Sequence, residues 1–375
     1  MDQGVKFIVD KKDLSTQART GVLITPHGAV STPVFMPVGT QGTVKFLLPE
    51  MLKEAGVEMV LGNTYHLYLR PGHEIIRKLG GLHTFMNWDR ALLTDSGGFQ
   101  VYSLSALRQV TEEGIIFKSH IDGSKHLITP ELAMNIQEAL GADIVMCLDD
   151  CPPYGVDFAT AERSVKRTLK WAHLCREAKK LPTQALFGIV QGACYPKLRS
   201  RAAEELKVMG FDGYAIGGLS VGEPKEMMFE IIAHTAAFLP LSSPRYVMGA
   251  GMPVDIVRAV SFGIDMFDCV IPTRCARHGL LFTNGEKVVI RNARYREDER
   301  PLDETCDCYT CRKYSRAYLR HLFVAKEALA MTLATIHNIR YYMRLMERIR
   351  ESIGKGRYGE FMEEFIKKGG WENDR

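Results

Sequence analysis

Short apolar runs recur along this chain, and each closes on a glycine, an amide or an aspartate. The runs begin at Val34, Met59, Ala91, Ile144, Ala185, Gly213, Tyr246 and Met266. They close on Gly39, Asn63, Asp95, Asp149, Gln191, Gly218, Gly249 and Asp268. A parallel sheet that is covered on both faces requires continuous apolar runs, whereas a half-exposed sheet shows alternation. The pattern therefore predicts eight buried parallel strands.

Segments with helical character separate most of these runs. They are residues 49–55, a segment opening at Thr129, and residues 159–179, 195–209, 224–239 and 253–262. Thr129 is a helix-capping residue, and the proline after it suits a first helical turn. Eight strand–helix units predict an α/β fold of the (β/α)8, or TIM-barrel, type. A doubly wound sheet is the alternative fold.

The runs also divide the chain. Residues 1–32 predict an N-terminal antiparallel hairpin or sheet, because apolar residues 21–24 are flanked by turn residues. Residues 33–290 are predicted to form the catalytic barrel. The long connection at about 86–128 predicts an insertion with short strands at 115–117 and 126–128. Residues 291–375 are predicted to form a helical subdomain.

Composition narrows the class of protein. The chain has 375 residues, of which 46% are hydrophobic and 25% charged, as in ordinary soluble proteins. It contains no run of 18 apolar residues, and residues 1–12 lack the apolar core of a secretion signal, so we expect a cytoplasmic location. The net charge of +4 does not by itself indicate a nucleic-acid partner. The basic stretch 340–357 is either a solvated helix face or a surface that follows phosphates.

Three of the nine cysteines are clustered. Cys306, Cys308 and Cys311 fall within six residues, and His337 follows on a segment with helical spacing. Three thiolates and an imidazole bind Zn²⁺ tetrahedrally, and four protein ligands make such a site structural. We therefore predict one structural zinc ion in residues 291–375. The alternatives are a helix-capping group of free cysteines, or His321 as the fourth ligand.

Polar residues at strand ends carry the candidate chemistry. In a TIM barrel these ends meet at one face, where active sites lie. Asp268 ends a buried run just before Pro272 and is placed to act on a substrate. Asp95 precedes Ser96, Gly97 and Gly98, whose backbone can approach a ligand closely. Asp149 could accept two N–H groups of a purine edge, although a capping role in a loop is the alternative.

Together these motifs resemble the tRNA-guanine transglycosylases, in particular the bacterial enzymes of the queuosine pathway. The resemblance rests on residues 95–100 (DSGGFQ), 148–151 (LDDC), 188–192 (GIVQG), 217–223 (GGLSVGE) and 266–274 (MFDCVIPTR), and on the cysteine cluster with His337. The motifs follow the family order from about Phe7 to the C-terminus.

The resemblance implies a reaction and its residues. The family exchanges guanine at the wobble position, 34, of certain tRNAs for a 7-deazaguanine base. Asp268 corresponds to the nucleophile that attacks ribose C1′, and Asp95 to the general acid/base. The implied base-binding residues are Asp95, Ser96, Gly97, Gly98, Phe99, Asp149, Gln191 and Gly218. The implied tRNA-binding residues are Gly249, Ala250, Gly251, Met252, Pro253, Val254, Asp255, Thr273, Arg274, Cys275, Ala276 and Arg277.

The resemblance also implies specificity and assembly. Cys151 and Val221 match the bacterial form, which takes 7-aminomethyl-7-deazaguanine (preQ1). Phe99 stands where some members have tyrosine. Bacterial members are homodimers, and the exchange needs no ATP or redox cofactor. Exchange with retention requires two displacements through a covalent glycosyl-enzyme, and the base must leave the anticodon stack.

Four aspartates would then crowd at one barrel mouth: Asp95, Asp149, Asp150 and Asp268. Because like charges this close cannot all ionise without cost, at least one pKa should be raised. We predict that Asp95 or Asp150 has the raised pKa and that Asp268 stays ionised.

Two other functions are weighed against base exchange. A metal-dependent hydrolase on the same barrel usually carries a His-x-His pair after the first strand, but residues 37–41 read PVGTQ. A non-catalytic tRNA-binding subunit need not keep Asp95 or Asp268, and this chain has both.

Overall fold

Eight parallel strands form a closed barrel in the computed structural model, which describes residues 4–98, 100, 108–285 and 287–368. In barrel order they are β4 (Val34–Gly39), β5 (Met59–Gly62), β6 (Ala91–Thr94), β10 (Ile144–Met146), β11 (Ala185–Val190), β12 (Gly213–Ile216), β13 (Arg245–Val247) and β14 (Met266–Cys269). β14 pairs with β4 and closes the ring, with Phe267 beside Phe35. Each apolar run supplies one strand, so the TIM-barrel prediction is confirmed.

The strands bury both of their faces. Met36, Leu61, Leu93 and Met146 belong to one apolar cluster inside the barrel. Their strand neighbours, such as Phe35, Val60, Leu92 and Val145, belong to a second cluster shared with the helices outside. This two-sided burial is the physical reason that the runs are continuous and not alternating.

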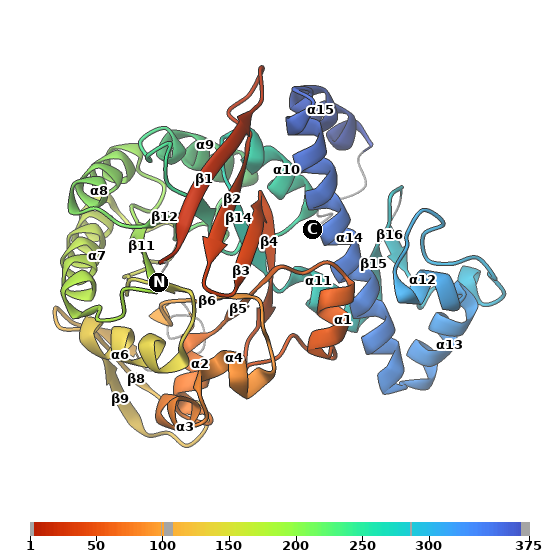
Figure 1. The fold of residues 1–375 in the computed structure, drawn as a ribbon, viewed down its shortest axis with the longest axis horizontal. Coiled ribbons are helices and arrows are strands. Elements are labelled where there is room, and N and C mark those ends of the chain that lie inside the picture. Colours follow the sequence, from red (N-terminus) through yellow and green to blue (C-terminus); the bar gives the residue numbers. More distant parts are fainter. Residues whose placement is uncertain (1–3, 99, 101–107, 286, 369–375) are drawn as a thin grey trace.

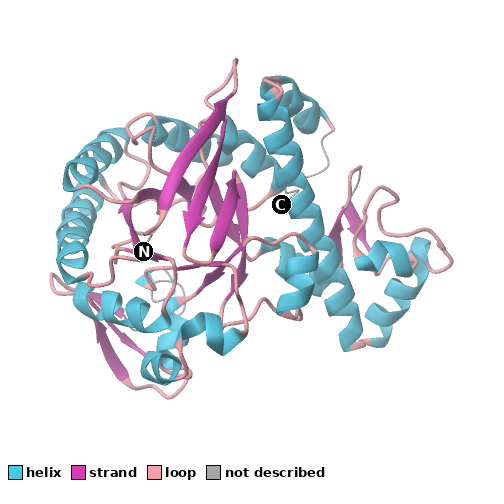
Figure 2. Ribbon diagram, in the orientation of Figure 1, coloured by secondary structure: helices cyan, strands magenta, loops and turns pink. Residues whose placement is uncertain are grey.

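Helices surround the barrel (Figure 2). They are α1 (Pro49–Glu54), α2 (Thr64–Leu69), α3 (His73–Lys78), α4 (Gly81–Met86), α6 (Pro130–Leu140), α7 (Phe158–Ala178), α8 (Pro196–Met209), α9 (Lys225–Ala236), α10 (Pro253–Ser261) and α11 (Ile271–His278). The Thr129 hydroxyl accepts a hydrogen bond from the Leu132 N–H at 3.2 Å and caps α6, as its sequence predicts.

An antiparallel sheet precedes the barrel. It contains three strands: β1 (Lys6–Lys12), β2 (Arg19–Thr25) and β3 (Gly28–Thr32). Leu23 and Val30 join the cluster inside the barrel, so this sheet covers the end at which the barrel strands begin (Figure 1). The insertion is also three-stranded: the two predicted strands, β8 (Ile115–Lys118) and β9 (Lys125–Ile128), pair with each other, and β7 (Arg108–Val110) pairs with β8.

A buried ion pair ties the N-terminal sheet to the barrel. The Arg19 guanidinium donates to Asp265, just before β14, from Nε at 2.9 Å and from Nη2 at 2.6 Å. Asp265 also accepts the N–H of Arg245 at 2.7 Å. Both side chains of the pair are almost fully buried.

The C-terminal region packs against the barrel and contains a long central helix. Its elements are β15 (Leu280–Phe282), β16 (Lys287–Val289), η1 (Ala293–Tyr295), α12 (Tyr309–Lys313), α13 (Arg316–Ala325), α14 (Ala328–Gly354) and α15 (Tyr358–Lys367). α14 lies against α11 and against β1, β2 and β4 (Figure 1). The Tyr342 hydroxyl of α14 donates to the Gly251 carbonyl at 2.6 Å. The division into 1–32, 33–290 and 291–375 stays a prediction.

Much of the basic stretch 340–357 is bound by the protein itself. Arg340 pairs with Asp307 and Glu347, and Lys355 pairs with Glu351. Arg350 donates to the carbonyl of Pro33 at 2.9 Å. These contacts engage Arg340, Arg350 and Lys355 within the fold; the choice between a solvated helix face and a surface that follows phosphates stays a prediction. In the part of the chain described, no helix has the length and apolarity needed to cross a membrane.

Replacing Asp265 with alanine should destabilise the fold by roughly 3–5 kcal/mol, because the Arg19 charge would stay buried without its partner. Denaturant unfolding of the purified variant measures this loss. Arg77→Ala removes a surface pair with Glu74 and is the control, for which we expect a much smaller change. Equal midpoints for the two variants would contradict the assigned anchoring role.

Candidate active site

A cavity of about 710 Å³ opens where the barrel strands end. Six of the eight run-closing residues line it: Asn63, Asp95, Asp149, Gly218, Gly249 and Asp268. The closed barrel brings them together from strands that are far apart in the sequence. Convergence of three carboxylates on one hollow is the arrangement expected of a catalytic site and not of separate strand caps.

Asp268 is fixed through one of its two carboxylate oxygens. Oδ1 accepts the Tyr246 hydroxyl at 2.5 Å and the Gly249 N–H at 2.8 Å, both from the neighbouring strand β13 or the residues just after it. Among the described residues, Oδ2 accepts no hydrogen bond. Burial raises the pKa of Asp268, and the bonds from Tyr246 and Gly249 oppose this increase. One oxygen is therefore held in place while the other remains available to a substrate.

Asp95 is held more tightly. Its Oδ2 accepts the Asn63 amide at 2.5 Å and its Oδ1 the Thr64 N–H at 2.8 Å. Burial, together with the nearby Asp268 charge, raises the pKa of Asp95 to about 6, although these bonds act in the opposite direction. A carboxyl group with this pKa exchanges protons near neutral pH, as a general acid/base must.

Asp149 presents a fixed carboxylate to the cavity. The Ser96 hydroxyl donates to its Oδ1 at 2.8 Å, and the Gln191 amide donates to its Oδ2 at 2.7 Å. Burial raises the pKa of Asp149, while Ser96 and Gln191 act in the opposite direction. Gly98 packs closely here, since a Cβ atom would lie 2.9 Å from the Asp149 carbonyl oxygen.

Asp150 does not join this group. Its carboxylate turns to Arg167, whose Nη1 lies 2.5 Å from Oδ2. The expectation that four aspartates crowd at one mouth is therefore wrong, because the chain turns after Asp149 and directs the next side chain towards α7. Burial raises the pKa of Asp95 and of Asp150, but it also raises the pKa of Asp149 and of Asp268, so the prediction that like-charge crowding would single out Asp95 or Asp150 is wrong. That Asp268 stays ionised remains a prediction.

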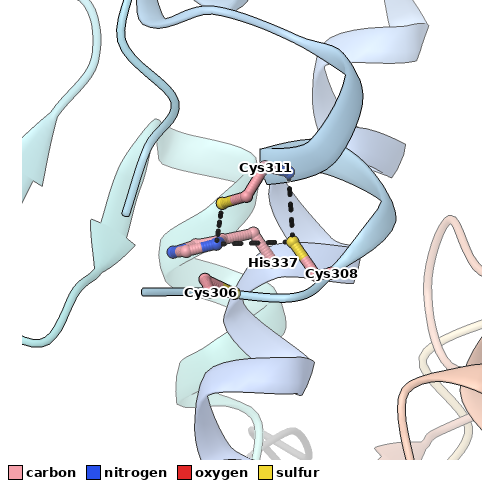
Figure 3. A group of neighbouring side chains, drawn as sticks. All are labelled: Cys306, Cys308, Cys311 and His337. Atoms are coloured by element: carbon pink, nitrogen blue, oxygen red, sulfur yellow. Dashed lines mark hydrogen bonds between the residues drawn. The ribbon is translucent and has the colours of Figure 1, made fainter. Parts of the chain in front are cut away.

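The clustered cysteines meet His337 in the C-terminal region (Figure 3). One ligand atom from each of Cys306, Cys308, Cys311 and His337 lies within 4.8 Å of the others. His337 Nε2 lies 2.6 Å from the Phe282 carbonyl oxygen, an acceptor, so Nε2 carries the proton. Nδ1 is thereby left as a lone pair facing Cys311 Sγ at 3.3 Å and Cys308 Sγ at 3.7 Å.

This donor set fits a tetrahedral metal ion, and the fixed imidazole tautomer is the one required for binding. His321 is not in the group; its ring stacks on Tyr318. The capping alternative is partly right, because Cys308 Sγ also accepts the Cys311 N–H at the start of α12.

Comparison with known proteins agrees with this geometry. Residues 13–370 match the family model described as Queuine tRNA-ribosyltransferase. A queuine tRNA-ribosyltransferase of Caldanaerobacter subterraneus subsp. tengcongensis is 60% identical over 365 residues, 97% of each chain. Those of Thermoanaerobacter sp. strain X514 and Solidesulfovibrio magneticus are 57% and 56% identical, covering 99% and 92% of this chain and 99% and 94% of their own.

The chain belongs to the queuine tRNA-ribosyltransferase family. It is accordingly a pentosyltransferase, and the carboxylates at the cavity are the candidate residues for that chemistry.

Only some of the base-binding residues predicted from the family resemblance line the cavity. Asp95, Ser96, Asp149 and Gly218 line the cavity. Gln191 lies behind Asp149 and supports it, and Gly97 has a left-handed φ of +79° beside Tyr65. Phe99 lies outside the described residues. The binding roles themselves stay predictions.

The predicted tRNA-binding residues differ in accessibility. Gly249, Gly251, Met252, Asp255 and Arg274 line the cavity. Ala250, Pro253, Val254, Thr273 and Ala276 are buried, so their side chains serve packing, while Cys275 and Arg277 are partly exposed. Arg274 and Arg277 project from α11 and form no ion pair within the described residues. Burial, with the neighbouring charge of Arg274, lowers the pKa of Arg277.

Sequence reasoning missed Tyr246 and Asn63 as partners of the two key aspartates. Tyr246 could have been suspected, because a tyrosine inside an aliphatic barrel needs an acceptor for its hydroxyl. Nothing in the sequence pairs Asn63 with Asp95, since that contact depends on the register between β5 and β6.

The raised pKa of Asp95 predicts a pH-dependent stability. A native pKa of about 6 lies above that of an unfolded aspartate, about 4. Protonated Asp95 therefore favours the fold: its contribution is complete below about pH 4 and is lost as the pH rises through about 6. Asp95→Asn mimics the protonated form. Compared with this variant, the wild type should lose roughly 3 kcal/mol in free energy of unfolding between pH 4 and pH 7.

Denaturant unfolding across this range measures the difference. Asp122→Asn is the control, because hydrogen bonds from Ser124 and Ser119 hold the pKa of that exposed carboxyl at about 2. The difference in free energy of unfolding between Asp122→Asn and the wild type should change little above pH 5. Parallel curves for wild type and Asp95→Asn would show that Asp95 has an ordinary pKa.

Proposed function

We propose that this protein exchanges guanine at position 34 of tRNA for preQ1 by double displacement through a covalent bond between Asp268 and the ribose. The supporting observation is the asymmetric environment of Asp268. Two donors fix its Oδ1, Oδ2 has no partner among the described residues, and Asp95 lines the same cavity. This is what an attacking carboxylate beside an acid/base requires.

In the first displacement, Asp268 Oδ2 attacks ribose C1′ and the bond from C1′ to guanine N9 breaks. Protonated Asp95 supplies a proton to the departing base, so guanine leaves neutral. In the second, ionised Asp95 takes the N9 proton of preQ1, N9 attacks C1′, and the bond to Asp268 breaks. Two inversions give net retention, as in retaining glycosidases.

Recognition of the base fits the other polar groups at the cavity. Asp149 is an acceptor for the adjacent N–H groups of the guanine edge, and Ser96 and Gln191 hold it in place. Val221 and Cys151 also line the cavity, which supports the small aminomethyl base as the incoming substrate. Arg274 and Arg277 are cations without an acidic partner in the described chain, and we assign them to the anticodon phosphates.

We further propose that the C-terminal cluster holds one structural zinc ion. Cys306, Cys308, Cys311 and His337 would bind it, and it would link the segment before α12 to α14. The ion would lie outside the catalytic cavity and supply no chemistry there, since no member of the cluster lines that cavity. A homodimer and a cytoplasmic location complete the proposal, from the resemblance to the bacterial enzymes and from the tRNA substrate.

Asp268→Asn should lower guanine exchange by at least about a thousandfold, because an amide oxygen cannot form the ester intermediate. Labelled guanine and tRNA with guanine at position 34 give the rate. A mobility-shift assay should show that tRNA still binds, and mass mapping of the trapped wild-type complex should place the adduct on Asp268.

Asp212→Asn is the matched control. Asp212 accepts the Leu186 N–H at 2.8 Å and lies at the end of the barrel where the strands begin. Because the catalytic cavity is at the other end, Asp212→Asn should keep the exchange rate. Full activity of Asp268→Asn would disprove the nucleophile. Release of free guanine without incorporation of label would instead indicate a hydrolase.

Zinc analysis of the purified protein should give one ion per chain, and Cys311→Ser should lose it with a fall in the thermal midpoint. The reason is that three ligands bind zinc less tightly than four, and binding contributes to folding. Cys194→Ser changes a cysteine outside the cluster and should retain the ion. The zinc site would be contradicted if the purified protein contained no metal and a chelator did not change its thermal midpoint.

A further inference from the structure

Arg199 of α8 is a fully buried arginine without an acidic partner. Its guanidinium donates only to backbone carbonyls: from Nε to Ala193 at 2.9 Å, from Nη1 to Val190 at 2.8 Å and to Gly217 at 2.7 Å, and from Nη2 to Gly218 at 3.4 Å. Within the described residues no carboxylate lies at ion-pair distance from it. Such burial is costly, so a specific use of the donors is the expected compensation.

These carbonyls belong to the ends of two neighbouring strands. Val190 is the last residue of β11, immediately before Gln191. Gly217 and Gly218 directly follow β12 and line the catalytic cavity. Arg199 therefore joins, from behind the cavity wall, the two segments that carry Gln191 and Gly218.

The bonds also set which way the peptide groups point. In a trans peptide the carbonyl and the N–H of the next residue point in opposite directions. Drawing the carbonyls of Gly217 and Gly218 back to the guanidinium therefore turns the N–H groups of Gly218 and Leu219 the other way, towards the cavity. Neither N–H donates to any described residue, whereas the Gly217 N–H donates to Val190 at 3.1 Å.

Two N–H donors near Gln191, whose amide supports the Asp149 carboxylate, match the guanine edge. That edge offers N–H donors at N1 and N2, which suit Asp149, and an adjacent 6-oxo acceptor, which suits backbone N–H groups. Gly218 must remain glycine, because at φ +66° a Cβ atom would lie 2.3 Å from Gln191 Oε1. The donors are thus close to the amide that supports Asp149.

We infer that Arg199 is a positioning residue for base recognition: it orients the Gly218 and Leu219 N–H groups towards the 6-oxo group of the base. This inference rests on the proposed function. It adds a residue outside the cavity whose removal should alter selectivity for a 6-oxopurine without touching the substrate.

Arg199→Lys should weaken guanine binding roughly five- to tenfold, because one ammonium group cannot hold the four carbonyls that the guanidinium spans. Binding of 2-aminopurine, which lacks the 6-oxo group, should change less than twofold. Titration of both bases into the full-length protein measures the two effects. In guanine exchange, KM for guanine should rise while KM for tRNA stays within twofold.

Arg245→Lys is the matched control. Arg245 is also buried and also donates to backbone carbonyls, from Nη2 to Leu239 at 2.8 Å, but it lies where β13 begins. Its variant should lose stability without changing the ratio of guanine to 2-aminopurine affinity. If Arg199→Lys weakens both bases equally, as a general loss of structure would, the inference is overturned.

Gly192→Ala provides a second route should Arg199→Lys not fold. A Cβ atom at Gly192 would lie 2.9 Å from the Arg199 backbone nitrogen, 3.1 Å from its Cγ and 3.2 Å from its Cδ, so it displaces Arg199 without removing its charge. It should reduce the same affinity ratio, and an unchanged ratio refutes the inference. If the wild type did not bind guanine, the proposed function itself would be refuted. This outcome can be told apart from failure of the inference, because it is seen in the unsubstituted protein.

Discussion

The pairing of β14 with β4 closes the barrel, and the site depends on that closure. Asp268 comes from the last strand of the ring, whereas Asp95 comes from the third. In an open sheet these residues could lie at different points along an edge. In a closed ring their strand ends face a common hollow, so an attacking group and a proton donor can share one substrate. The neighbouring strand β13 supplies Tyr246, and Gly249 follows it, so the pairing of β13 with β14 positions the donors that hold Asp268.

Burial and hydrogen bonding act against each other at each carboxylate of this site. Removal from water raises the pKa of Asp95, Asp149 and Asp268, while the hydrogen-bond donors on each act in the opposite direction. The donors also determine geometry, because a carboxylate with one or both oxygens occupied cannot rotate freely. Asp268 keeps one oxygen without a partner among the described residues, whereas Asp95 and Asp149 each use both. This difference agrees with the proposed roles, in which Asp268 attacks the ribose, Asp95 exchanges a proton and Asp149 recognises the base.

The C-terminal region supports the barrel from outside. Tyr342 of α14 donates to Gly251, a cavity-lining residue, and His337 of the same helix belongs to the cysteine cluster. One helix thus connects the candidate metal centre to the wall of the active site. A bound ion would fix α12 and α14 relative to each other, which is a structural contribution distinct from catalysis.

Local sequence determined the strands, their order and the chemistry at their ends. Continuous apolar runs predicted strands covered on both faces, and six of the eight residues that closed them line one cavity. Cysteine spacing likewise indicated the metal ligands, because three thiols within six residues already lie close together. The pattern of runs was therefore sufficient to name the glycines and aspartates at strand ends, although their catalytic and binding roles remain predictions.

Only the tertiary structure decided which side chains meet. It separated Asp150 from Asp149, chose His337 over His321, added strands to both antiparallel sheets, and placed Tyr246 beneath Asp268. It also brought Arg199 behind Gly218. These contacts join residues many positions apart, and each depends on register, strand closure and the path of a loop. Hydrophobic periodicity reports which face of an element is buried, but not which partner lies opposite it, and for that reason the sequence alone could not specify them.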